Sequence, residues 1–123
     1  MHKLNNAMDM AANAEIEDEL DAMRDLFGDD FSMLAELYLT DSPKRLAALR
    51  ESATTGNASE TAQIAHSLGG SCASIGAPGL ALLCQNVELD CRAGRIDNLG
   101  TQLHLIEAAY ARIEIRLRAM LQA

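Results

Sequence analysis

Aromatic residues and valine are scarce in this sequence of 123 residues. It has two Tyr, two Phe and no Trp, and its one valine is Val87. A core must therefore be built from Leu, Ile, Ala and Met, and of these Ala and Leu are strong helix formers, whereas valine favours strands. The composition predicts an all-α protein, and the length suits one domain with one core.

Basic residues are also few. The sequence has ten Lys and Arg and 18 Asp and Glu, so the formal net charge is -8. An acidic surface repels nucleic acid and anionic membranes, so neither is expected as a partner. No apolar run approaches the roughly 18 residues that a membrane-spanning helix needs. Residues 1–14 contain no apolar stretch typical of a signal peptide, so we expect a cytoplasmic location, either free or as the cytoplasmic part of a membrane-bound parent.

Motifs of nucleotide-dependent and hydrolytic enzymes are absent as well. The sequence has no Gly-rich dinucleotide fingerprint, no P-loop and no Gly-x-Ser-x-Gly turn. A metal site formed by His66 and the three cysteines, Cys72, Cys84 and Cys91, is an alternative. However, their spacing lacks the Cys-x-x-Cys pattern, and Cys72 and Cys84 fall on predicted core stripes. We therefore expect core cysteines and no cofactor or metal bound by this chain.

Apolar residues recur at helical spacing along most of the chain. Because the segments between these patterns are short, successive helices are expected to lie antiparallel. The predicted helices cover approximately residues 15–27, 30–54, 57–75, 80–94 and 97–121. The expected fold is an antiparallel up-down four-helix bundle with a short additional N-terminal helix, together spanning residues 15–123. Residues 1–14 lack clear periodicity and are interpreted as a flexible tail or linker.

Several residues are expected to start or interrupt these helices. Asp29 or Asp30 can cap the second helix, and Asn57 or Ser59 can cap the third, because short polar side chains accept hydrogen bonds from free backbone N–H groups. Pro43 lies inside the second helical pattern and is expected to kink or break it.

His66 has a distinctive neighbourhood among the three histidines. His2 lies in the tail, and His104 falls beside the core stripe of the last helix, where we expect it at the surface. In helical projection His66 stands at the edge of the core face. Its neighbours one and two turns away are small, apart from Gln63. These small neighbours are Ala62, Gly69, Gly70 and Ala73.

Gly69 and Gly70 are adjacent inside a predicted helix, where each glycine costs roughly 1 kcal/mol relative to alanine. One explanation is that a partner protein approaches His66 across this bare flank. The other is that the glycines let a neighbouring helix pack closely, with His66 a solvated edge residue. Helical projection leaves both readings open. Replacing either glycine by a better helix former is expected to stabilise the helix.

The segment around His66 resembles the signature of histidine-containing phosphotransfer (HPt) domains. The sequence AHSLGGSCASIGA at 65–77 is similar to the family pattern Ala-His-x-Leu-Lys-Gly-Ser-(Ser/Ala/Cys), followed after a short spacer by Gly-Ala. Further on, Leu80, Leu83, Cys84 and Glu88 match the pattern Leu-x-x-Leu-Cys-x-x-x-Glu. The resemblance covers most of the chain, from about residue 15 to about residue 121.

The resemblance implies that His66 is the phosphoryl acceptor and that Gly70 leaves room for a receiver domain. It places Glu88 opposite the histidine, where the carboxylate can accept a hydrogen bond from Nδ1–H and leave Nε2 free; Glu88 can also pair with Arg92 at i+4. The chain departs from the family at Gly69, where a lysine usually neutralises the phosphoryl group. Arg92 is our candidate for the substitute cation, and Gln63 for a further neighbour of the phosphoryl group.

The expected function is that of a phosphorelay intermediate without a kinase domain of its own. It would exchange a phosphoryl group with aspartate-phosphorylated receiver domains of response regulators, with a cognate sensor kinase as a further partner. The Mg²⁺ ion would belong to the receiver. The chain would be a separate protein or the C-terminal domain of a bacterial hybrid sensor kinase. The alternative is a bundle that docks receiver or kinase domains without efficient transfer.

Overall fold

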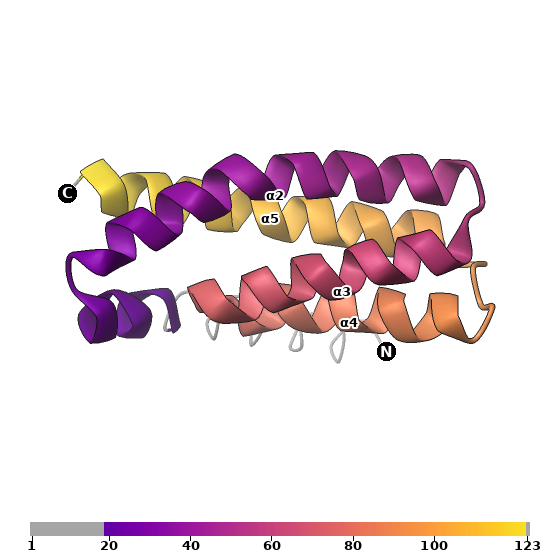
Figure 1. Cartoon of the computed structure of the whole chain (residues 1–123), viewed down its shortest axis with the longest axis horizontal. Helices are drawn as coiled ribbons and strands as arrows, with labels where there is room; N and C mark the ends of the chain where they lie inside the picture. The colour runs from indigo at the N-terminus through magenta and orange to yellow at the C-terminus, as the bar shows by residue number, and fades with distance from the viewer. Residues whose placement is uncertain (1–18, 123) are drawn as a thin grey trace, which may run out of the picture.

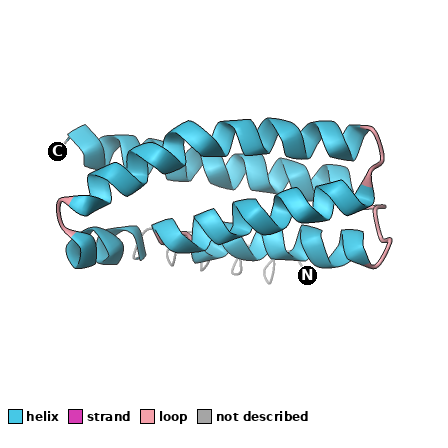
Figure 2. Cartoon of the chain, in the orientation of Figure 1, coloured by secondary structure: helices cyan, strands magenta, loops and turns pink. Residues whose placement is uncertain are grey.

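The computed structural model describes residues 19–122, which form long helices packed side by side (Figure 1). Residues 19–27 are helical. The four long helices are α2 (Asp30–Thr54), α3 (Ala58–Ile75), α4 (Pro78–Arg92) and α5 (Leu99–Gln122). Within the described part there are helices, turns and loops but no strands (Figure 2). Successive long helices run in opposite directions, which confirms the all-α, up-down four-helix bundle with an additional N-terminal helix.

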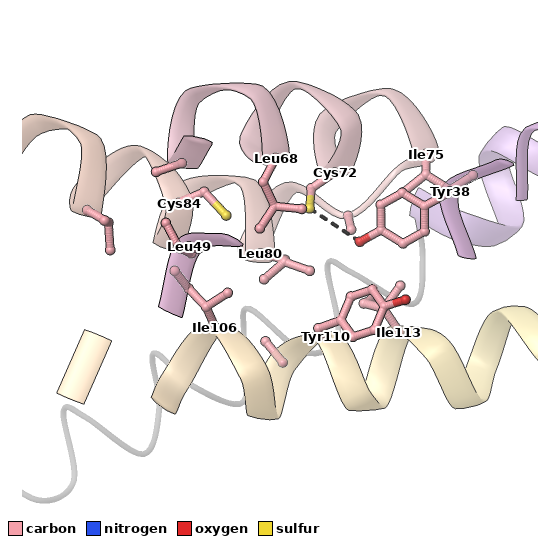
Figure 3. Packing of buried hydrophobic residues seen from close by; sticks show 14 of the residues in the cluster. Tyr38, Leu49, Leu68, Cys72, Ile75, Leu80, Cys84, Ile106, Tyr110 and Ile113 are labelled. Atoms are coloured by element: carbon pink, nitrogen blue, oxygen red, sulfur yellow. Dashed lines mark hydrogen bonds between the residues drawn. The ribbon is translucent and has the colours of Figure 1, made fainter. Parts of the chain in front are cut away.

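The four long helices enclose one core. α2 packs on α3, α3 on α4, α4 on α5, and α5 back on α2. Fully buried aliphatic side chains meet at the centre, among them Leu68 of α3, Leu80 of α4 and Ile106 of α5 (Figure 3). The two tyrosines, Tyr38 and Tyr110, are also buried and lie with their ring centroids 5.9 Å apart. An aliphatic core with few aromatic residues was expected from the composition and is confirmed. No helix in this part of the chain is long and apolar enough to cross a membrane.

The helix ends follow the sequence signals in part. Gly28 ends the helical residues 19–27 with a positive φ of 57°. Asp29 occupies the N-cap position of α2, but its side chain makes no capping hydrogen bond, because its backbone is already in the helical region. The expected capping by Asp29 or Asp30 is therefore wrong. Asn57, in contrast, caps α3 by accepting a hydrogen bond from Glu60 N–H at 3.1 Å.

Pro43 does not break α2, contrary to one of the two expected outcomes. The helix continues from Asp30 to Thr54 with Pro43 inside it. The proline lies on the exposed side, while Leu39 and Leu49 on either side are buried. A proline removes one backbone hydrogen bond of the helix, and packing of the flanking turns compensates for that loss.

The α3–α4 turn sets the relative position of the two helices that carry the candidate site. Gly76 ends α3 with a φ of 96°, and Pro78 is the first residue of α4. A Cβ at Gly76 would lie 2.7 Å from the Met23 side chain and 2.8 Å from the Glu19 carbonyl oxygen, both on the N-terminal helix. Glycine is therefore required here both by its backbone conformation and by the close packing of residues 19–27 against the turn.

Candidate functional site

His66 stands on the exposed edge of α3 and is oriented by a carboxylate from α4. Its side chain is 72% exposed, and its Nδ1 lies 3.0 Å from Oε1 of Glu88. An ionised carboxylate only accepts hydrogen bonds, so Nδ1 carries the proton and donates it to this contact. In the neutral imidazole, the other ring nitrogen, Nε2, then has a free lone pair and is nucleophilic.

Glu88 holds both His66 and an arginine. Its second oxygen, Oε2, accepts a hydrogen bond from Arg92 Nε at 3.1 Å, and its side chain is only 16% exposed. Burial raises the pKa of the Glu88 carboxyl, but the hydrogen bonds from His66 and Arg92 outweigh burial and bring the pKa below its ordinary value. Glu88 is therefore ionised at neutral pH. The two expected contacts of Glu88, with His66 and with Arg92 at i+4, exist at the same time.

Two open hollows border His66, one on each side of α3. The hollow between α3 and α4 has a volume of about 570 Å³ and includes Gly70, Ala73 and Glu88. The hollow between α2 and α3 has a volume of about 690 Å³. Its lining residues are Leu34, Leu37, Tyr38, Asp41, Arg45, His66, Ser67, Gly70, Ser71, Ser74 and Ile75. His66 thus projects from α3 between the two hollows, where another protein could contact both sides of the helix.

The small residues near His66 divide into exposed and buried ones. Gly70 and Ala73 are exposed, and a Cβ built at Gly70 would meet nothing within 4 Å. Ala62 is completely buried, so its predicted place on the partner-facing flank is wrong. α2 packs closely on this end of α3, where the hydroxyls of Ser52 and Thr61 lie 2.8 Å apart and the core encloses Ala62.

Gln63 is exposed, three residues before His66 on α3. It makes no side-chain hydrogen bond with another residue between 19 and 122. It does not border either of the two hollows beside His66. Its expected role beside a phosphoryl group stays a prediction.

Gly69 serves helix packing, and it also borders the α3–α4 hollow beside His66. A Cβ at Gly69 would lie 3.2 Å from Cys84 Cβ and 3.6 Å from the Ala81 carbonyl oxygen, both on α4. The glycine therefore lets α3 and α4 approach closely. The close-packing explanation therefore applies to Gly69, whereas a side chain at Gly70 would meet only open space.

We expect alanine to have different effects at the two glycines. Gly70→Ala should raise the free energy of unfolding by about 1 kcal/mol through helix propensity alone. Gly69→Ala should raise the free energy of unfolding by less than this or lower it, because the new Cβ must push against Cys84 across the α3–α4 contact. Denaturant unfolding of both variants measures the difference, and each serves as the control for the other. Equal gains would show that Gly69 does not control the approach of the helices.

The three cysteines belong to the core, as expected. Cys72 and Cys84 are fully buried and Cys91 is nearly so. The Tyr38 hydroxyl lies 3.3 Å from the Cys72 sulfur (Figure 3). The contact with Cys72 and burial both raise the pKa of the Cys84 thiol. In residues 19–122 there is no group of three or more His, Cys, Asp and Glu residues arranged to hold a metal ion.

The sequence reading missed the contribution of α2 to the site. Leu34 of this helix is 38% exposed and borders the α2–α3 hollow together with Leu37. Asp41 and Arg45 of the same helix also border the hollow. The available signal was the apolar surface of α2, which is wider than one core stripe requires.

Comparison with known proteins identifies the family of this bundle. The Hpt domain family model matches the chain over residues 33–123. Among solved structures, the chain is similar to histidine-containing phosphotransfer protein B (HptB) from Pseudomonas aeruginosa PAO1, with 25% sequence identity and a TM-score of 0.78 over 84% of this chain and 90% of that chain. No curated protein matches the sequence significantly. Because the family model covers all of α3, α4 and α5 and the similar structure shares the bundle, this chain belongs to the Hpt domain family, whose members carry phosphoryl groups in two-component signalling.

Proposed function

We propose that His66 is the phosphoryl-accepting residue and that it exchanges the group with aspartate-phosphorylated receiver domains. The observation that carries this proposal is the orientation of the ring. Glu88 fixes the proton on Nδ1, while 72% of the His66 side chain is open to solvent. A nucleophile needs a free lone pair and access for its partner, and Nε2 has both.

The transfer step follows from this arrangement. The Nε2 lone pair attacks phosphorus of the receiver's aspartyl phosphate, an N–P bond forms, and the bond between phosphorus and the aspartate oxygen breaks. The electron pair of that bond returns to the aspartate carboxylate. The imidazole ring becomes positively charged while it keeps its Nδ1–H, and the Glu88 carboxylate stabilises that charge. Transfer to a second receiver is the same step in reverse.

The surroundings of His66 suit the approach of another protein domain. The exposed leucines Leu34 and Leu37 lie on the α2 side of the histidine. On α3, Gly70 and Ala73 have side chains too small to obstruct an approaching domain. Protein interfaces typically bury apolar residues and keep polar groups at the rim of the contact. In this proposal the receiver brings Mg²⁺ and the acidic pocket that holds it, and this chain contributes only the nucleophile and the groups that orient it.

The direct test is transfer from a receiver domain carrying radiolabelled aspartyl phosphate. The proposal expects label on this chain that is stable in base and labile in acid, as phosphohistidine is, together with loss of label from the receiver. If the receiver binds this chain but keeps its label, the chain is a docking module without transfer. Absence of both binding and transfer across a panel of receivers would overturn the proposal.

Removing the carboxylate that orients His66 should slow transfer. We expect Glu88→Ala to lower the rate by about tenfold, since groups that orient a reactive imidazole typically contribute about 10–100-fold. Glu88→Gln should lose less, because its amide oxygen still accepts from Nδ1–H. Single-turnover transfer from a phosphorylated receiver gives the rate. Glu114→Ala is the control, because Glu114 also pairs with an arginine at i+4 but lies on α5. A similar loss in Glu114→Ala would contradict the assigned role.

A further inference from the structure

Phosphorylation of His66 creates a charge that the histidine's own helix does not neutralise. A phosphohistidine carries up to about two negative charges, on a chain whose formal net charge is already -8. At the position where the family usually has lysine this chain has Gly69, which packs against Cys84. A cation that contacts the phosphoryl group must therefore come from outside α3.

Arg92 of α4 is poorly placed for this purpose. It donates from Nε to Glu88, whose other oxygen accepts from His66 Nδ1. The two nitrogens of an imidazole point in divergent directions. Nε2, where the phosphoryl group would sit, therefore faces away from Glu88 and its arginine. Arg92 supports the carboxylate that holds the ring and lies on the opposite side of that ring from the phosphoryl group.

Arg45 of α2 lies on the other side of the histidine. It borders the α2–α3 hollow together with His66, Ser67 and Ser71. Its side chain is 36% exposed, and its Nε donates to the carboxylate of Asp41 at i−4. Its two terminal nitrogens make no hydrogen bond with any residue from 19 to 122. The guanidinium therefore has free donors in a hollow that His66 also borders.

We propose that Arg45 is the phosphoryl-binding cation of this domain and that, on the proposed function of His66, α2 supplies the charge that the usual lysine of α3 would provide. Asp41 competes for the guanidinium, but an exposed ion pair of this kind contributes little free energy. A phosphoryl group offers more charge and several acceptor oxygens, and a guanidinium can bind two of them at once. Arg45 can keep Asp41 at Nε and use its terminal nitrogens for the phosphoryl group. The Ser67 and Ser71 hydroxyls in the same hollow are further polar neighbours.

The experiment uses phosphoramidate, a small molecule that phosphorylates histidine, so that no receiver domain is needed. Wild type, Arg45→Gln, Arg45→Lys and Lys44→Gln are loaded and followed by ³¹P NMR. Lys44→Gln is the matched control, because Lys44 is the exposed neighbour of Arg45 and does not border the hollow. The two readouts are the titration midpoint of the phosphoryl group and the lifetime of the phosphohistidine.

We expect Arg45→Gln to raise the titration midpoint and to shorten the lifetime by about threefold or more, with Arg45→Lys in between and Lys44→Gln like wild type. If wild type loads on His66 but Arg45→Gln and Lys44→Gln behave alike, Arg45 does not contact the phosphoryl group and this inference is overturned while the proposed function stands. If wild type does not load on His66, the proposed function fails, and the role of Arg45 fails with it.

Discussion

Glutamine in place of His66 should abolish phosphate uptake and leave the bundle folded. The amide of glutamine cannot act as a nucleophile toward phosphorus, so the expected loss is complete. The fold should survive because the His66 side chain is 72% exposed and outside the core, and exposed substitutions of this kind usually change stability by no more than about 0.5 kcal/mol. Acid-labile, base-stable phosphate from a labelled receiver measures uptake, and circular dichroism with thermal unfolding measures the fold.

The matched control for that experiment is His104→Gln. His104 is also exposed and also helical, but it lies on α5. This variant should take up phosphate like wild type. Uptake at the wild-type level by His66→Gln would move the acceptor to another histidine. His104 and His2 would then be the candidates, although His2 lies outside the described residues.

A large side chain at Gly70 should block transfer while stabilising the protein. Gly70 borders both hollows beside His66, and nothing lies within 4 Å of a Cβ built there. Gly70→Gln should therefore raise the free energy of unfolding by several tenths of a kcal/mol or more. The new side chain would stand one turn from the histidine, where a receiver must approach. We expect transfer from a phosphorylated receiver to slow by at least about tenfold, since a misplacement of the reacting groups by 1 Å can cost about a hundredfold.

Two variants separate obstruction from other effects of that substitution. Gly70→Ala adds only a methyl group and should transfer nearly as well as wild type. Gly100→Gln makes the same change at an exposed glycine of α5 with equally open surroundings and should leave transfer unchanged. Transfer rates that do not depend on the size of the side chain at Gly70 would show that the receiver does not approach over this residue.

The helices and their order could be predicted from the sequence because their signals are local. Apolar spacing marked all four long helices, Asn57 marked the start of α3, and Gly28 marked the end of the N-terminal helix. Pro43 was harder to judge, since its effect depends on packing of the flanking turns. Asp29 failed as a cap because capping requires a backbone conformation that its residue type does not determine.

The site could be predicted where it depends on one helix and its motif, and less well where helices meet. His66, Gly70 and Glu88 have the expected exposure and contacts. Ala62 was misplaced because projection of one helix does not show how closely its neighbours pack. For the same reason, projection could not decide between the two explanations for Gly69. Arg45 lies 21 positions before His66 in the chain. Such a long-range neighbour is found only once the arrangement of α2 and α3 is known.

The contact between Gly69 and Cys84 also constrains how this domain can evolve. Any side chain at 69 would push the Cβ of Cys84 by a few tenths of an ångström. Cys84 lies one turn before Glu88 on α4, so the displacement would reach the carboxylate that holds the imidazole of His66. We therefore expect lysine at 69 to introduce a charge and to shift the helix that holds Glu88 in the same substitution. We expect the two positions to be epistatic, so that the effect of a substitution at 69 depends on the residue at 84.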